Sequence, residues 1–371
     1  MPKIDRLPDG TYQARISVVD PTTGKRHQPR VRARSQRALQ DAIAEERARI
    51  RRGEHHEPDT TPLGDWLDTW YATYRASPSS RAARLGAVRR IQRDEIARVP
   101  LGRLRRVHVQ TFVDRLATTL APRTVRDTAT TLGMALDRAV RLDIIPTSPA
   151  EHLDLPRVPR RAMAVWSDEE VRRVLDAAGE TDDAAFWVLA VMLGLRIGEL
   201  IGLRWSDIDL AAGRLTVART MTHDEQRRQY IGETTKTPSS RRTITLPLPC
   251  QAALVTHRRR SAEARLALGD LWELEDAVFH SGTGGHWRSD RRYRRLLRAL
   301  CAAADVPVIR VHDLRHTAAT AMLRAGVPIT TVAHILGHSS AAVTLGIYGH
   351  VIRAMEDEAA NVIGAMYEQR A

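Results

Sequence analysis

The sequence predicts a multidomain protein that is mainly α-helical with small β-sheets, and three observations lead to this fold class. The length of 371 residues is enough for two or three domains. Apolar residues recur at helical spacing through most of the chain, and strand-like alternation is confined to short segments. Polar or proline-containing stretches at residues 54–60 and 155–161 predict linkers. The expected domains are therefore residues 1–55, 60–155 and 162–371.

The first domain is expected to be a small β-sheet with one helix packed on it. Residues 11–19 and 28–33 alternate like two strands on either side of a turn, and a helix follows from Ser35 to Gly53. Positions 1–40 hold nine basic and three acidic residues, which indicates a nucleic-acid contact, with a solubilising surface hairpin as the alternative. The candidate DNA contacts in this domain are Arg30, Arg32 and Arg34.

The second domain is predicted to be all α-helical. Its first helix places apolar residues at i, i+3, i+4 and i+7, namely Leu63, Trp66, Leu67 and Trp70. Similar spacing continues to about residue 145. Arginines are frequent on these helices, where they suit DNA phosphates or simply form solvated faces. The linker that follows contains two prolines and is basic, and its candidate DNA contacts are Arg160 and Arg161.

The third domain is predicted to combine helices with a few short strands. Ser167 opens a capping-box pattern that leads into an apolar helical face. Residues 184–203 predict another helical stretch. Residues 215–218 and 243–246 predict short strands, and residues 277–281 a third strand at the edge. The remainder is expected to be helical.

Composition narrows the class of partner. The chain has 57 basic and 44 acidic residues, a net charge of +13, so a polyanion such as nucleic acid is the expected partner. The longest apolar run, residues 184–195, is too short to span a bilayer, and the first residues hold no apolar signal region. Cys250 and Cys301 make neither a disulfide framework nor a metal-binding spacing. We therefore expect a cytoplasmic protein that does not enter membranes.

Two charged positions in the third domain are candidates for chemistry. Arg196 and Glu199 lie at i, i+3 within an apolar run, where they form either a structural ion pair or part of a catalytic site. Lys236 lies between two predicted strands, and it is one of only three lysines among the 57 basic residues. A lysine can release a proton at neutral pH and an arginine cannot, which suggests a proton-transfer role, although chance retention on a surface loop is the alternative. Arg241, at the end of the same segment, is a further candidate DNA contact.

Histidines supply a second group of candidates. His312 and Arg315 share one face of a predicted helical turn, in the sequence HDLRH. The pairs His312/His316 and His334/His338 are each spaced i, i+4, which is compatible with zinc ligation. We disfavour a metal site because the glutamate of the H-E-x-x-H motif is absent and Arg315 would repel a cation.

A tyrosine completes the set of candidates. Tyr348 follows the Leu-Gly-His sequence that ends at His338 by ten residues. A lone tyrosine on a helix is usually a core residue with a satisfied hydroxyl, so only its place among the other candidates distinguishes it.

Taken together, these residues resemble the tyrosine recombinase (phage-type integrase) family in order and spacing. The elements are an Arg with a Glu three residues on, a lysine in a turn between strands, His-x-x-Arg, Leu-Gly-His and a tyrosine. Residues 62–156 resemble the family's helical core-binding domain, and the first 55 residues resemble the three-stranded arm-type DNA-binding domain of its longer members. Residues 162–371 would then form the α+β catalytic domain. The resemblance implies the catalytic residues Arg196, Lys236, His312, Arg315 and His338 with the nucleophile Tyr348, and Glu199 as a supporting residue.

The resemblance also implies roles that suit phosphodiester chemistry. Arg196 and Arg315 would clamp the phosphate and balance the charge that grows in the transition state. Tyr348, whose ordinary pKa is about 10, needs a base, and His312 is the candidate. Lys236 would protonate the departing 5′ oxygen, and His338 would donate to a non-bridging oxygen.

The expected product is a 3′-phosphotyrosyl DNA that conserves the ester energy. A 5′ hydroxyl from another duplex can attack this ester, so neither ATP nor any other cofactor is expected, and no metal. The resemblance implies double-stranded DNA with core and arm attachment sites as the partner, and a homotetramer in the synaptic complex. A directionality (excision) factor and a host DNA-bending protein are further expected partners. Residues 351–366 resemble the family's C-terminal tail helix, which docks on a neighbouring protomer or folds back on its own domain.

Two other functions are compatible with parts of the pattern. A type IB topoisomerase-like enzyme uses the same chemistry to relax DNA, although it gains little from a second sequence-reading domain. A catalytically silent DNA-binding regulator would need the basic charge and the helical domains, but it leaves Tyr348, Lys236 and the two arginines unexplained.

Overall fold

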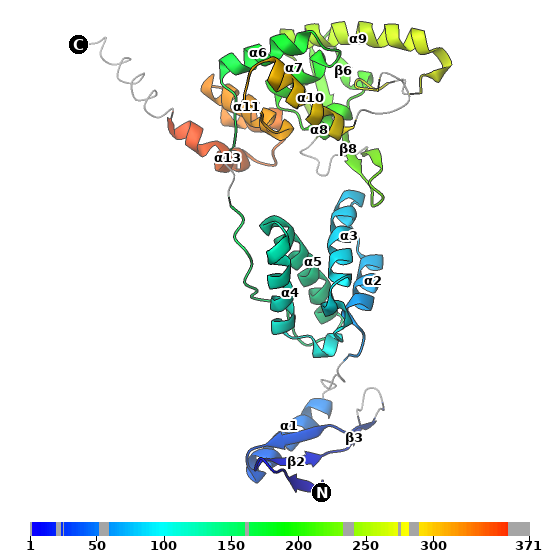
Figure 1. The fold of residues 1–371 in the computed structure, drawn as a ribbon, viewed down its shortest axis with the longest axis vertical. Coiled ribbons are helices and arrows are strands. Elements are labelled where there is room, and N and C mark those ends of the chain that lie inside the picture. The colour runs from blue at the N-terminus through cyan, green and yellow to red at the C-terminus, as the bar shows by residue number, and fades with distance from the viewer. Residues whose placement is uncertain are drawn as a thin grey trace, which may run out of the picture. The chain divides into compact units, whose positions relative to one another are not determined.

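The computed structural model describes residues 2–19, 24, 26–51, 59–159, 163–232, 241–273, 276–281 and 289–354. The chain divides into two compact units, residues 1–159 and 160–371 (Figure 1). The first unit contains two separate hydrophobic clusters, one around the N-terminal sheet and one among the helices that follow. The second unit contains a large cluster and a smaller one that includes Tyr348.

A small antiparallel sheet with one helix packed on it forms the start of the chain. Three strands pair in the order β1-β2-β5, and a two-stranded ribbon is formed by β3 and β4. The bounds are β1 (Ile4–Arg6), β2 (Tyr12–Arg15), β3 (Val18–Val19), β4 (Arg26–His27), β5 (Arg30–Ala33) and α1 (Gln36–Arg51). Leu39 and Ile43 of α1 are buried against Ala14 and Ile16. Ser35 lies before the helix, where its Oγ accepts a hydrogen bond from the backbone N of Ala38 at 3.2 Å.

This sheet contains one strand more than the alternation of the sequence indicates. Strand β1 was not predicted because it has only three residues, two of them charged. The strand expected over residues 11–19 is interrupted between β2 and β3, where the backbone N of Ile16 donates to the carbonyl O of Pro29 at 3.1 Å. The three-stranded sheet β1-β2-β5 agrees with the number of strands that the family resemblance implied.

A helical bundle follows, as predicted. It consists of α2 (Leu63–Thr73), α3 (Pro78–Gln92), α4 (Arg106–Thr119) and α5 (Pro122–Arg141), with short 3₁₀ turns η1 (Glu95–Arg98) and η2 (Leu101–Arg103). The four residues at helical spacing in α2 are all buried, which confirms the face predicted from the sequence. Trp66 also donates from Nε1 to the carbonyl O of Ala135 at 2.9 Å, which fixes α2 against α5.

The second unit surrounds two small β-structures with helices. Its helices are α6 (Asp168–Gly179), α7 (Ala184–Leu193), α8 (Ile197–Ile201), α9 (Leu248–Leu268), α10 (Asp290–Ala303), α11 (Val311–Arg324), α12 (Ile329–Leu336) and α13 (Ala341–Ala354), with 3₁₀ turns η3 (Trp205–Asp207) and η5 (Gly269–Leu271). Strands β6 (Ile208–Asp209), β7 (Arg214–Val217) and β10 (Arg242–Thr245) form a sheet in the order β10-β7-β6. Strands β8 (Thr220–His223) and β9 (Gln229–Gly232) form a separate hairpin. Phe186 and Tyr293 stack at a ring-centroid distance of 3.5 Å inside the large core.

The sequence located some of these elements correctly and others not. The capping box is confirmed: Ser167 Oγ accepts from the backbone N of Glu170 at 3.2 Å, and Glu170 Oε2 accepts from the backbone N of Ser167 at 2.7 Å. The third strand predicted at residues 277–281 is wrong, because β6 occupies that edge and Ala277 makes only an isolated bridge to Arg204. The β8–β9 hairpin was not predicted from the sequence. No helix among the described residues is long and apolar enough to cross a membrane.

Candidate active site

The backbone between α7 and α8 determines where Arg196 lies. The helical stretch expected over residues 184–203 consists of two helices, because α7 ends just before Gly194, whose φ is +61°, and α8 begins at Ile197. A Cβ at Gly194 would lie 2.8 Å from Leu336 Cδ2 and 3.1 Å from Ala318 Cβ, so α11 and α12 approach the backbone closely here. Arg196 therefore occupies the N-cap position of α8 instead of lying inside a helix.

Glu199 holds two arginines from different parts of the chain. Its Oε1 accepts from Arg196 Nη1 at 2.7 Å, and its Oε2 accepts from the Arg196 backbone N at 2.9 Å. Arg242, at the start of β10, donates from Nη2 to Oε2 at 3.0 Å and from Nη1 to Oε1 at 3.2 Å. Arg242 also donates from Nε to the carbonyl O of Ile335 at 2.7 Å. Glu199 and Arg242 together thus connect α8, β10 and the end of α12.

This buried group is ionised. Burial alone would raise the pKa of Glu199, but the hydrogen bond and charge of Arg242, together with the charge of Arg196, hold that pKa below its ordinary value. Arg242 was not among the candidates chosen from the sequence. The available signal was the alternation within β10, where Arg242 and Ile244 are both buried and the intervening Thr243 is exposed.

Arg315 lies at the centre of the site with an unsatisfied donor. The residue is 3% exposed, and its Nη1 donates to the carbonyl O of Gly194 at 3.0 Å. Its Nη2 is buried without a hydrogen-bond partner among the described residues. Burial and the nearby charge of Arg196 lower the pKa of Arg315 to about 9, so the guanidinium remains mainly charged at neutral pH. A buried cation with a free donor is suited to binding an anion.

Three histidines surround this guanidinium. Burial lowers the pKa of His312, and the charge of Arg315 lowers it further. Burial, Arg315 and Arg196 lower the pKa of His338 to about 4. His338 is held by Thr344 of α13, whose Oγ1 lies 2.7 Å from its Nδ1. His316, one turn after His312 on α11, has its pKa lowered by burial and by His312.

The Tyr348 side chain reaches the same pocket from α13. Tyr348 is 1% exposed, and burial raises the pKa of its hydroxyl to about 12, against the opposing effect of the Arg315 charge. Its Oη lies 2.7 Å from Nδ1 of His316. The imidazole in contact with the tyrosine is therefore His316, which the sequence analysis considered only as a metal ligand. Assigning the contact from the sequence would have required knowing how α13 packs on α11.

The remaining candidates lie elsewhere or outside the described residues. Lys236, Arg160 and Arg161 fall outside them, as does most of the predicted C-terminal tail beyond residue 354. Arg241 is exposed and lines a cavity of about 350 Å³ with Arg242, His334 and His338. In the N-terminal sheet Arg30, Arg32 and Arg34 are all exposed. Arg32 is paired with Asp9 at 2.6 Å, so it is less available for DNA than the other two.

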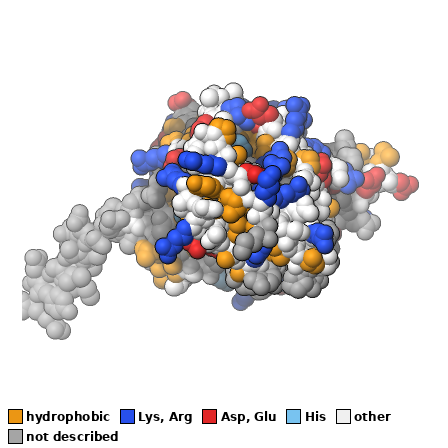
Figure 2. Space-filling view, turned by 90° about the horizontal axis from the view of Figure 1, so that it is seen from below, with side chains coloured by type: hydrophobic (Ala, Val, Ile, Leu, Met, Phe, Trp, Pro, Cys, Tyr) orange, Lys and Arg blue, Asp and Glu red, His pale blue; other side chains and the backbone are white. Residues whose placement is uncertain are grey.

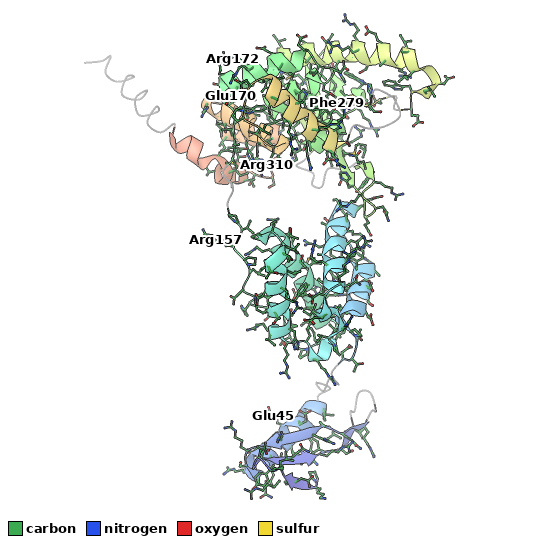
Figure 3. All side chains as sticks on the ribbon, viewed as in Figure 1. Glu45, Arg157, Glu170, Arg172, Phe279 and Arg310 are labelled. Carbon is green, nitrogen blue, oxygen red and sulfur yellow. The ribbon has the colours of Figure 1, made fainter. Side chains whose placement is uncertain are left out.

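A second cavity is lined in part by His312. It measures about 570 Å³ and is lined by Arg294, Arg298 and Arg310 among others. Figure 3 shows Arg310 at the N-terminal end of α11, where it is paired with Asp313 at 2.7 Å. Figure 2 shows more basic than acidic side chains on the face in view. No group of three His, Cys, Asp or Glu side chains in the described part of the chain is arranged to hold a metal ion.

Gly337 leaves no room for a side chain next to Arg242. Its φ is +66°, and an added Cβ would lie 2.5 Å from Arg242 Nη1. We expect Gly337→Ala to lower the free energy of unfolding by about 2 kcal/mol, because alanine is strained at this φ and the Arg242 side chain must move. Denaturant unfolding measures the effect. Gly346→Ala, at a helical position with open space around it, is the matched control and should be neutral or slightly stabilising. Equal effects of the two variants would contradict this account of Gly337.

Comparison with known proteins identifies the family. A model of the phage integrase family matches residues 165–354, which is just over half of the chain. The chain belongs to the phage integrase family. All six residues assigned as catalytic from the sequence fall within the matched range. Tyrosine recombinases of this family are DNA breaking and rejoining enzymes, and this chain is one of them by descent.

The likeness to individual integrases extends over most of the chain. A XerC-like tyrosine recombinase of Caldanaerobacter subterraneus subsp. tengcongensis is 27% identical over 86% of this chain and 86% of its own length. The ICEBs1 integrase of Bacillus subtilis is 24% identical over 96% of this chain and 98% of its own. The Tn1549 transposon integrase, solved in complex with a circular intermediate DNA, has a TM-score of 0.67 at 18% identity, covering 80% of this chain and 99% of that one. The predicted mainly helical, multidomain recombinase fold is confirmed by these structural matches.

Proposed function

We propose that this integrase is a site-specific tyrosine recombinase that cuts and rejoins DNA through a 3′-phosphotyrosyl bond to Tyr348, and so integrates or excises a mobile element. The observation that carries the proposal is that α13 brings the Tyr348 hydroxyl, within one chain, into the pocket of Arg315 and His316. The relatives support the mobile-element substrate, because they include the ICEBs1 integrase and an integrase from the transposon Tn1549.

The two arginines of the site are proposed to bind the scissile phosphate. Arg315 offers a buried charge and a free Nη2, and Arg196 keeps its side chain partly exposed while Glu199 orients it. The pentavalent transition state carries more negative charge on its non-bridging oxygens than the ground state does. Donors fixed in advance toward that charge lower the barrier more than they strengthen substrate binding.

Histidine and lysine are proposed to complete the phosphate site. His338, fixed through its Nδ1 by Thr344, is left with Nε2 to donate to a non-bridging oxygen. His312 lies three residues before Arg315 on α11, and burial together with the charge of Arg315 lowers its pKa. Lys236 is proposed as the acid that protonates the leaving 5′ oxygen, on the strength of the family pattern. The sequence-based choice of His312 as the base of Tyr348 is not supported by this geometry, since the hydroxyl contacts His316.

Three regions are proposed to divide the binding of DNA. Residues 60–155 and 162–371 would both bind the core site, with Arg160, Arg161 and Arg241 on the DNA backbone. Residues 1–55 would bind separate arm sites through Arg30 and Arg34. The homotetramer is supported by a lambda integrase tetramer solved on a Holliday junction, which matches 91% of this chain with a TM-score of 0.55. An excision factor and a host DNA-bending protein would set the direction of the reaction.

Trapping the covalent intermediate tests the proposal. DNA that remains attached to the protein after denaturation is sequenced, and a duplex of that sequence is nicked next to the cleavage point so that rejoining fails. The wild-type protein should accumulate an adduct, and Tyr348→Phe should reduce it to background because the nucleophilic oxygen is gone. Tyr230→Phe, in the β9 strand, serves as the matched control and should retain the adduct.

Two outcomes would contradict the proposed function. An adduct that persists in Tyr348→Phe would show that another residue attacks the DNA. Efficient relaxation of supercoiled plasmids that lack the trapped sequence, without recombinants on plasmids that carry it, would favour a topoisomerase-like enzyme.

A further inference from the structure

The nucleophile of this integrase has a basic partner that the family pattern does not assign. Nδ1 of His316 lies 2.7 Å from Oη of Tyr348, and the tyrosine is 1% exposed. The imidazole of His316 is thus the hydrogen-bond partner that the described residues give this hydroxyl, and it is placed to receive the proton directly. The rings of His316 and Tyr348 are also in contact, with centroids 5.6 Å apart.

His312 lies one step further from the nucleophile. It precedes His316 by one turn of α11, and the two rings meet edge to face with centroids 5.2 Å apart. Its neighbour on the same helix face is Arg315, the proposed ligand of the phosphate. The geometry thus separates the two histidines by what they touch, with His312 beside the phosphate-binding arginine and His316 on the tyrosine hydroxyl.

We infer that His316 is the general base that removes the Tyr348 proton during cleavage, and the general acid that returns it during rejoining. The inference rests on the proposed function and specifies one of its steps. In cleavage the Oη–H bond breaks and the proton moves to Nδ1. The freed electron pair forms the new bond from Oη to phosphorus, and the bond from phosphorus to the 5′ oxygen breaks with its pair on that oxygen. The general acid of the site then protonates the 5′ oxygen, so protons and electrons balance.

The charges around His316 are compatible with this cycle. Its own helix presents His312, Arg310 and Arg315, which disfavour a proton on the imidazole, and Asp313, which favours one. From the turn before α13, His338 also interacts with it, and α13 contributes Tyr348 itself. Without DNA, burial and then the charge of His312 keep the pKa of His316 below its ordinary value, so the imidazole is neutral and able to accept a proton at pH 7. A bound phosphodiester adds negative charge near Arg315, which stabilises the imidazolium once it forms.

Cleavage by a His316→Asn variant is the first measurement. Asparagine can hydrogen-bond the tyrosine from about the position of Nδ1, but it takes up no proton near neutral pH. We expect single-turnover adduct formation to be slower by about 10²-fold or more at pH 7. The rate of the variant should rise steadily between pH 7 and pH 9 as solvent hydroxide replaces the base, whereas the wild-type rate should level off above the pKa of His316. A wild-type rate and pH profile in His316→Asn would overturn the inference.

A substrate whose leaving group needs no proton provides the second measurement. In the Tyr348→Phe background, DNA ending in a 3′-p-nitrophenyl phosphate is joined to a strand with a 5′ hydroxyl, and nitrophenolate departs in place of the tyrosine. Adding His316→Asn should leave this joining rate within about twofold, because no phenolic proton is transferred. Adding His312→Asn, the matched variant one turn away, should slow it, because the phosphate site is disturbed.

The outcomes separate the inference from the proposed function. Slower joining on adding His316→Asn would overturn the base assignment and place His316 with the phosphate ligands or the structural core. His316→Gln is tested in the same Tyr348→Phe background. An unchanged joining rate with either His316→Asn or His316→Gln also demonstrates that the fold is intact. If the wild-type chain forms no adduct through Tyr348 at all, the proposed function fails first, before the role of His316 is in question.

Discussion

Replacing Arg315 by methionine should lower the rate of DNA cleavage by about 10²-fold or more, without lowering the thermal stability of the free protein. The loss of rate follows because the buried guanidinium supplies charge and a free Nη2 to the phosphate. Stability should be retained because no carboxylate among the described residues forms an ion pair with this cation, and its burial disfavours the charged form. Methionine, an apolar side chain of similar size, therefore removes the free-energy cost of burying a charge, and it also removes the hydrogen bond to the carbonyl O of Gly194.

Cleavage of the nicked duplex and thermal unfolding are the two measurements. Arg315→Lys, which keeps a charge but loses the planar fork, should fall between the wild type and Arg315→Met in rate. Arg324→Ala, at the exposed end of the same helix, is the matched control and should change neither quantity. A large fall in the melting temperature of Arg315→Met with normal cleavage would reverse the roles that we assign.

Replacing Arg242 by methionine should lower the stability of the protein, which Arg315→Met should not do. Its guanidinium is 1% exposed and is paired with Glu199, which is 4% exposed. Removal of one member of a buried pair leaves a charge without compensation, and we expect a loss of about 3 kcal/mol in the free energy of unfolding. Arg196 continues to pair with Glu199, which limits the loss. Cleavage should also slow, since Arg242 connects the carboxylate that orients Arg196 to the carbonyl O of Ile335, three residues before His338.

Urea denaturation of the two single variants and the double variant measures the coupling free energy between Glu199 and Arg242. Glu199→Gln together with Arg242→Met should cost less than the sum of the two single changes, by about 0.5–3 kcal/mol. The contribution of Glu199 also depends on pH. Because its pKa is lower in the folded protein than in the unfolded chain, its stabilisation is present above the ordinary pKa of 4.5 and is lost as the pH falls through the folded value. Additive single changes, or a difference between wild type and Glu199→Gln that grows in acid, would contradict the pairing.

The sequence predicted the helices better than the details between them. The spacing of Leu63, Trp66, Leu67 and Trp70 and the Ser167 capping box are local signals, and both are confirmed. The break at Gly194 was not predicted, because the apolar run continues across it and periodicity does not reveal a left-handed φ. Strand β1 is too short to give a clear alternation, and in β8 and β9 only Met221 is buried, so these strands show no alternation of buried and exposed residues.

The candidate site divides in the same way. Arg196, Arg315, His338 and Tyr348 were chosen from motif spacing, and the structure brings them to one pocket around Arg315. The contacts of Arg242 and His316 in the site were not predicted, because their partners are distant in the chain. Arg242 meets Glu199 across 43 residues, and His316 meets Tyr348 across 32. Such contacts depend on how β10 and α13 pack, and no local pattern encodes that.

Helix α13 is fastened at two points four residues apart. The hydroxyl of Thr344 is hydrogen-bonded to His338, and the hydroxyl of Tyr348 is hydrogen-bonded to His316. A shift of this helix by a single turn would break both hydrogen bonds together, so the proposed nucleophile Tyr348 and the proposed phosphate donor His338 would lose their positions in one movement. The position of α13 alone would therefore determine whether the proposed site is assembled.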